Sequence, residues 1–455
     1  MTKQVDVGLF FGESFYEVIF TERPSGTILF SGSFFNIKDP FKNKFPKLVQ
    51  NFGEVKIDSV FVSYRYLERI FKYKLGGSVA QVVTKGFENW LGSHHYNKNE
   101  SLFFLKSAPD LSSFDMIFPV NEKISYDGNV QLPIDLNEVN ELIESLKKKE
   151  AKRVCLNLVN AHKNPIHHNL LKKILIENQF EVFDRLETSK DSSAVDWRTC
   201  LIEASLAGTF NEMRSEIVET LQQFTTIENI SFVNNSFEGK GSRNILSGLF
   251  ALEDAFFEVG KSELKLPDQF SVVHLGLENF SVWLNKIEPW QSPWGATSLV
   301  ARKRIDLEIQ PTNSFHLNSF EDIEISQSEE SFEPGPMCLG RGKIPCVYDI
   351  LNAEFSTPEL QKKIRDSFWA LARSSTGPHA TEKTFDEFKT VIWDRILIES
   401  SLLINTETVV FYGDLPPSFE RRAKEIFNTK NTVFVSQKKL LKAHLALLQG
   451  RTRAN

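Results

Sequence analysis

Apolar and polar residues alternate along the start of the chain in the period-two pattern of strands. The pattern predicts strands at residues 5–10, 14–21 and 27–35. A turn that contains Pro24 and Gly26 separates the last two strands. The chain is therefore expected to open as a three-stranded meander.

Further along, strands alternate with amphipathic helices. In "PIDLNEVNELIESLKKKEAKRVCLNLV", apolar residues at helical spacing follow Asp135, which can cap a helix. A buried strand at residues 154–159 comes next, and a second helix is expected to begin at Pro165. Because strands and helices alternate, the sequence indicates an α/β sheet.

The strand-turn-strand pattern of the opening occurs a second time. Alignment of "VDVGLFF" with "VHLGLEN" places Gly8 over Gly276, which favours a duplicated fold. The acidic, serine-rich stretch 319–336 is expected to be a loop. Helices at 358–373 and 384–403, a strand at 408–412 and a basic tail follow.

Composition excludes several classes of protein. A net charge of -6 and a pI near 6.0 argue against a nucleic-acid-binding surface. No apolar run approaches the ~18 residues of a membrane span, and the polar start gives no signal peptide, so a cytoplasmic protein is expected. The cysteines form no C-x-x-C pair, which argues against a structural zinc site and a disulfide framework: Cys155, Cys200, Cys338 and Cys346.

Several motifs in chain order carry a family resemblance. They are "VDVGLFFGESFYEVIF", "VAQVVTKGFENWL", "YDGNVQLPIDLNEVNELIESLKKKEAKRVCLNLVNAHKNPIHHNLLKKIL", "RNILSGLFALEDA" and "FEPGPMCLGRGKIPCVYD". Together they resemble the hydantoinase A / 5-oxoprolinase family, which includes the beta subunits of acetone and acetophenone carboxylases. The resemblance implies a two-lobed, actin-like ATPase fold, a duplicated ribonuclease H-like architecture. We expect domains at residues 1–200 and 201–355, with a mostly helical C-terminal extension at 356–455.

The resemblance also implies a chemistry and its residues. Members of the family use ATP to activate a cyclic amide or a carboxylation substrate, usually beside a second subunit, so phosphates and a metal must be held. The implied metal ligands are Asp6, Glu13 and Glu333. The implied residues of the nucleotide cleft are Asp6, Gly8, Gly12, Glu13, Ser247, Gly248, Gly276 and Gly335.

This chain departs from the family pattern at the phosphate contacts. In the first turn Leu9 replaces a glycine, and Phe10 and Gly12 replace threonines. In the second turn His274 stands where the family has aspartate, Leu277 replaces a glycine and Glu278 a threonine. We predict that Leu9 and Phe10 crowd the cleft where phosphates would lie.

The leading hypothesis is a degenerate family member without cofactor that acts as a structural or regulatory subunit. Its partner would be a hydantoinase B-like or other protein subunit, and assembly into a homo-oligomer is an alternative. One alternative is an active ATP- and Mg-dependent cyclic-amide hydrolase or carboxylase subunit with a remodelled site. Another is a small-molecule-binding protein that uses the interdomain cleft. No catalytic residue is assigned.

Residues outside the nucleotide motifs have plainer interpretations. His162, His167 and His168 cluster in sequence, and a surface helix start is favoured over a metal site. Cys338 is expected to be a buried thiol. Trp290 and Trp294 fit either a core or a partner-binding surface.

Overall fold

The computed structural model describes most of the chain in several stretches. The described residues are 3–12, 15–35, 39–64, 78–93, 113–186, 194–232, 247–250, 252–254, 256–258, 264–277, 279–292, 295–317, 323–325, 336–339, 342–376 and 382–436.

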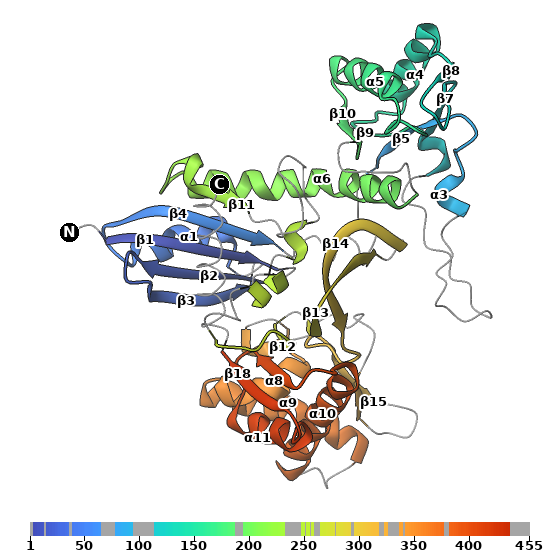
Figure 1. Ribbon diagram of the computed structural model, residues 1–455. Coiled ribbons are helices and arrows are strands. Elements are labelled where there is room, and N and C mark those ends of the chain that lie inside the picture. Colours follow the sequence, from blue (N-terminus) through green and yellow to red (C-terminus); the bar gives the residue numbers. More distant parts are fainter. Residues whose placement is uncertain are drawn as a thin grey trace.

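The first lobe is built on the predicted meander. Its sheet has the order β11-β4-β1-β2-β3, in which β1, β2 and β3 are antiparallel neighbours and β4 and β11 run parallel to β1. Apolar side chains of β1 pack with α1 and the long α6 in one core. Figure 1 shows these two helices beside the sheet. The elements are β1 (Lys3–Phe11), β2 (Phe15–Glu22), β3 (Thr27–Phe35), α1 (Phe41–Gln50), β4 (Val55–Tyr64), α6 (Ala194–Leu221) and β11 (Ile230–Phe232).

The second lobe repeats this topology. Its sheet has the order β14-β13-β12-β17-β18, again with an antiparallel meander followed by two parallel strands. The strands are β12 (Phe270–Leu275), β13 (Phe280–Ser292), β14 (Gly295–Asp306), β17 (Thr408–Tyr412) and β18 (Asn431–Val435). The register of the two hairpins aligns Gly276 with Gly12, because the N–H of Gly12 donates to Phe15 and the N–H of Gly276 donates to Asn279 across the turn. Gly8, which the sequence alignment placed over Gly276, lies inside β1, so that part of the alignment is wrong. The predicted two-lobed, duplicated actin-like ATPase fold is confirmed.

The last hundred residues are mostly helical, as expected, but they also complete the second sheet. Strand β17 pairs with β12, and β18 pairs with β17. Residues before and after position 355 therefore share one hydrophobic core. Strand β16 lies inside the stretch expected to be a loop and pairs with β15. The elements are β15 (Phe315–Leu317), β16 (Ile323–Ile325), α8 (Val347–Asn352), α9 (Pro358–Thr376), α10 (Glu382–Leu403) and α11 (Pro417–Ile426).

An α/β unit is inserted between β4 and α6, and we call it the insertion domain (residues 78–186). Its parallel sheet has the order β10-β9-β5-β6 and a core of its own. Asp135 caps α4 by accepting a hydrogen bond from the Asn137 N–H at 2.8 Å, as predicted. The elements are β5 (Ala80–Thr84), α3 (Trp90–Ser93), β6 (Ile117–Val120), β7 (Lys123–Ile124), β8 (Val130–Leu132), α4 (Leu136–Lys148), β9 (Arg153–Asn157), α5 (Ile166–Glu177) and β10 (Glu181–Phe183).

The β13–β14 hairpin links the two lobes. It extends from the second sheet toward α6 in Figure 1, where the Ser298 N–H donates to the Thr199 hydroxyl at 2.9 Å. Trp290 on this hairpin packs edge-on against Phe250, with ring centroids 5.4 Å apart. Trp290 therefore belongs to packing within this chain, and Trp294 lies outside the described residues.

Candidate functional site

The ends of β1 and β12 face one another across a pocket between the lobes. The pocket has a volume of about 70 Å³, well below the roughly 300–1,000 Å³ of typical ligand sites. Both lobes contribute to its lining, which consists of Phe10, Phe11, Gly12, Phe15, Glu17, Ser63, Leu252, His274, Gly276, Leu277, Asn279 and Tyr412. The cleft that the repeat predicted therefore exists, and it is narrow and largely aromatic.

In the first hairpin, the Phe10 ring lies over Gly8 within strand β1. A Cβ atom at Gly8 would lie 3.0 Å from Cε2 of Phe10 and 2.8 Å from Cγ2 of Ile19. Phe10 also lines the interdomain pocket, as predicted. The space above this glycine is filled by hydrocarbon, so Gly8 is required here by packing.

In the second turn, the imidazole of His274 lies over Gly276. A Cβ atom at Gly276 would lie 2.5 Å from Cε1 of His274. The imidazole packs against Trp283 and Tyr412, at centroid distances of 4.8 and 4.9 Å, and these two rings lie 6.0 Å from each other. His274 is 5% exposed, so the ring is buried beside this aromatic pair.

A third ring covers the turn that the sequence matched to the family's "LSGP" segment. A Cβ atom at Gly248 would lie 2.5 Å from Cζ and 2.7 Å from the hydroxyl of Tyr64. Tyr64 is buried, and its ring also packs against Phe210 at 4.8 Å. Ser247 opens the short 3-10 turn that contains Gly248.

Asp6 is engaged in an ion pair within the first lobe. Its Oδ2 accepts a hydrogen bond from Nε of Arg23 at 2.5 Å, and Nη2 of Arg23 donates to Ser59 at 3.0 Å. The Asp6 side chain is 2% exposed and is not among the lining residues of the pocket. The structure thus gives this carboxylate a local role.

The structure brings some of the expected cleft residues together. Gly12 and Gly276 line the same pocket. Gly8 and Gly248 are each covered by a ring, as described above. The remaining expected residues, Glu13, Glu333 and Gly335, lie outside the described residues, as does Glu278.

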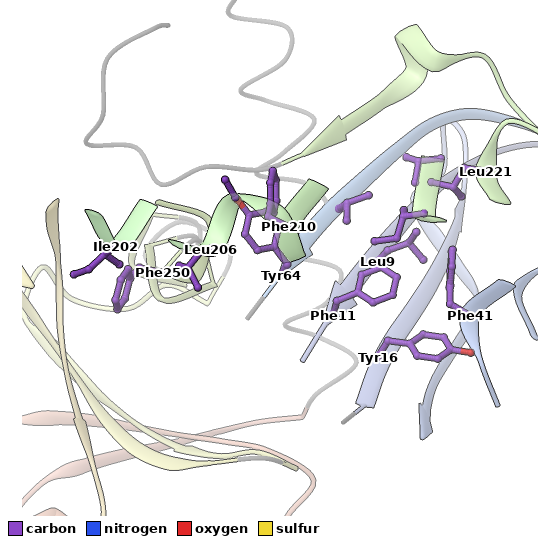
Figure 2. Close-up of a cluster of buried hydrophobic side chains, with 14 of the residues drawn as sticks. Leu9, Phe11, Tyr16, Phe41, Tyr64, Ile202, Leu206, Phe210, Leu221 and Phe250 are labelled. Atoms are coloured by element: carbon purple, nitrogen blue, oxygen red, sulfur yellow. The ribbon is translucent and has the colours of Figure 1, made fainter. Parts of the chain in front are cut away.

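Leu9 corrects one prediction. Its side chain does not crowd the cleft but is fully buried in the first-lobe core, where Figure 2 shows it with Phe11 and Phe41. Successive residues of a strand point to opposite faces, and Leu9 lies on the core face, opposite to Phe10. Of these two residues, Phe10 is the one that lines the pocket.

The histidines and Cys338 also differ from the predictions. His167 and His168 are 5% and 2% exposed, so the helix start is buried against the insertion-domain sheet and is not a surface. Cys338 is only half-buried, whereas the other three cysteines are buried, and none of the four forms a disulfide among the described residues.

Sequence reasoning did not identify the rings that cover the glycines as a group. Tyr412 reaches His274 through the pairing of β17 with β12, and Tyr64 meets Gly248 from a distant part of the chain. The sequence contained one local indication of these rings, because an aromatic residue lies two positions from the glycine in both strand-turn-strand segments.

The described residues contain neither a clear metal site nor a membrane span. No three His, Cys, Asp or Glu side chains among them gather in a metal-binding arrangement. No helix in the described part of the chain is both long and apolar enough to cross a bilayer.

The comparisons with known proteins agree with the fold. The model of the hydantoinase/oxoprolinase N-terminal region matches residues 56–179. An uncharacterized protein of Methanocaldococcus jannaschii is 31% identical over 99 residues, which are 21% of this chain and 14% of that protein.

Two solved structures share the architecture at low sequence identity. Acetone carboxylase, in its nucleotide-free structure, has a TM-score of 0.71 and 13% identity over 90% of this chain, which spans 65% of that chain. The ATP-dependent caprolactamase from Pseudomonas jessenii has a TM-score of 0.71 and 14% identity over 97% of this chain and 70% of its own. Residues 56–179 therefore match the hydantoinase/oxoprolinase N-terminal region, and the chain as a whole shares the fold of these two structures.

Proposed function

We propose that this chain is a family member that does not hydrolyse ATP and that acts as a structural or regulatory subunit. The observation that carries the proposal is the set of rings over the cleft glycines: Phe10 over Gly8, His274 over Gly276 and Tyr64 over Gly248. Phosphate-binding turns need open backbone N–H groups that an anion can approach. Here side chains lie over these glycines, and the N–H groups of Gly12 and Gly276 already donate to the carbonyls of Phe15 and Asn279.

The electrostatics of the pocket support the same proposal. Phosphoryl transfer requires positive groups and metal-holding carboxylates around the phosphates. The pocket lining contains no lysine or arginine among the described residues, and its one carboxylate, Glu17, accepts a hydrogen bond from Ser33 at 3.0 Å. A polyanion placed there would lose its hydration without gaining charged partners.

A titration of the purified chain with Mg-ATP tests the proposal. We expect no dose-dependent rise in the melting temperature and no phosphate release. A ligand at 100 times its Kd would add about 2.7 kcal/mol of stability, which the assay would detect. A saturable rise would overturn the proposal and favour the alternative, an ATP-dependent cyclic-amide hydrolase or carboxylase subunit.

The subunit role needs a separate measurement. The structural neighbours are an acetone carboxylase and a caprolactamase, and we propose a hydantoinase B-like protein as the partner. Co-expression with such a subunit, followed by size-exclusion chromatography with light scattering, should give a stable complex in the absence of nucleotide. Migration of the two chains as separate species would contradict the subunit role and leave the nucleotide result intact.

A further inference from the structure

The insertion domain has a polar edge that the proposed function does not use. Its four strands are parallel, and from β5 the chain passes first to β6 on one side and later to β9 on the other. In open parallel sheets, ligands bind beyond the carboxyl ends of the strands where the strand order reverses. Here that position lies between the ends of β5 and β9, at Thr84 and Asn157.

Most polar groups at this edge already have partners. The Thr84 hydroxyl donates to Glu122 and accepts from the Val159 N–H at 3.0 Å. The other carboxylate oxygen of Glu122 is 2.7 Å from Nδ1 of His167. These contacts satisfy a buried carboxylate and a buried imidazole together, so they leave nothing for a ligand to complete.

Asn157 and His168 differ from these groups. They are 4% and 2% exposed, yet Nδ2 of Asn157 and both ring nitrogens of His168 have no hydrogen-bond partner among the described residues. The nearest acid to His168 is Asp184, whose Oδ1 lies 3.8 Å from Nε2, too far for a hydrogen bond. Buried polar atoms without partners are rare because each costs free energy, so a bound group is their natural complement.

Asn157 and His168 line the same half-open pocket. Its volume is about 30 Å³, which admits a group of very few heavy atoms. Ala161, His162 and Trp197 also line it. The unpartnered atoms therefore belong to one binding position between β9, α5 and the start of α6.

The charges around this pocket are already paired. Arg185 is held by Glu203 at 3.1 Å, and Lys172 holds Asp184 at 2.9 Å. Asp196, a further lining residue, is engaged by a neighbour as well. With no free cation or anion among these groups, the pocket favours an uncharged ligand.

The hydrogen-bonding requirements narrow the ligand further. Burial lowers the pKa of His168 and so favours the neutral imidazole, which has one N–H and one lone pair. Asp184 faces Nε2 and favours the proton there, so Nδ1 is an acceptor, while Nδ2 of Asn157 is a donor. A ligand must therefore offer a donor to His168 and an acceptor to Asn157.

We propose that this pocket binds a small uncharged group that carries a hydrogen-bond acceptor beside a donor, of which a primary carboxamide is the simplest. The proposal rests on Asn157, His168 and the carboxyl edge of the sheet. It does not depend on the state of the interdomain cleft or on the proposed function.

Three probes of nearly equal shape test the charge and hydrogen-bonding pattern: acetamide, acetate and acetamidinium. Each is titrated into the full chain while NMR follows the ring signals of His168. Acetamide is expected to give a saturable change, and the two ions none. A stronger response to acetate, or no response to any probe, would overturn the proposal, the latter because the pocket then holds only water.

Substitutions at Asn157 make the test specific. Asn157→Asp replaces the donor by a charged acceptor, so acetamide binding should weaken by about tenfold or more and acetamidinium should now bind. Asn140→Asp on the exposed face of α4 is the matched control and should change nothing. If Asn157→Asp does not fold, Asn157→Leu removes the donor without adding charge. Unchanged acetamide binding in either variant would refute the assignment.

Discussion

The two lobes have the same strand order, and the register of their hairpins aligns Phe10 with His274 and Gly12 with Gly276. Both rings line the pocket, but they cover different glycines. The Phe10 ring lies over Gly8 inside its own strand, whereas the His274 ring lies over Gly276 and packs against Trp283 and Tyr412. Equivalent positions in the two lobes therefore carry different rings with different surroundings.

The leucines next to these glycines sharpen the comparison and carry the largest expected effect. Leu9 and Leu277 align in the sequence repeat, but Leu9 lies inside β1 and is fully buried in the core, whereas Leu277 lies in the turn after β12 and is a half-buried lining residue. Leu9→Ala should cost about 2–5 kcal/mol of unfolding free energy because it leaves a cavity. Leu277→Ala should cost about 1 kcal/mol or less.

Urea denaturation of both variants measures the difference. Equal losses would show that the two turns are packed alike and would break the comparison between the lobes. A saturable gain of Mg-ATP binding in Leu9→Ala would contradict its assignment to the core.

The glycines give the next largest effect. Gly276→Ala places a Cβ 2.5 Å from the buried His274 ring, so a loss of about 1–3 kcal/mol is expected. In the His274→Ala background the same change should be nearly neutral, because the obstructing ring is gone. Gly8→Ala should stay costly in the Phe10→Ala background, since Cγ2 of Ile19 still lies 2.8 Å from the new Cβ.

Double-mutant cycles on thermal or urea unfolding check this contrast. The expected coupling exceeds about 1 kcal/mol for Gly276 with His274 and is smaller for Gly8 with Phe10. Coupling of the same size in both pairs would mean that the two rings restrict their turns equally.

Local pattern was enough to predict the first lobe because its three opening strands are joined by short turns. The second sheet was less visible, since β17 pairs with β12 across more than a hundred residues and β18 is short, with polar residues beside it. The cleft could be placed from Gly8 and Gly276, yet its closure by His274 depends on Tyr412 from that distant strand. The burial of His167 likewise depends on Glu122, 45 residues away in sequence.

Asp6 gives the smallest expected effect. It aligns with His274 only in the sequence repeat, and we attribute its presence to Arg23, whose side chain is 32% exposed. Because water screens a partly exposed partner, Asp6→Asn should cost only about 1 kcal/mol. Arg23→Gln should cost a similar amount, and the double variant little more than either one.

A cycle of these variants separates the ion pair from a role in metal binding. If the role of Asp6 is its ion pair with Arg23, the losses of unfolding free energy from the two substitutions are not additive. Mg²⁺ then changes the melting temperature of Asp6→Asn by the same amount as that of the unsubstituted chain. If Asp6 were kept as a metal ligand, the substitutions would be additive, and Mg²⁺ would stabilise only the chain that retains Asp6. The first lobe would then hold half of a working site, and the two lobes would differ in function as well as in packing.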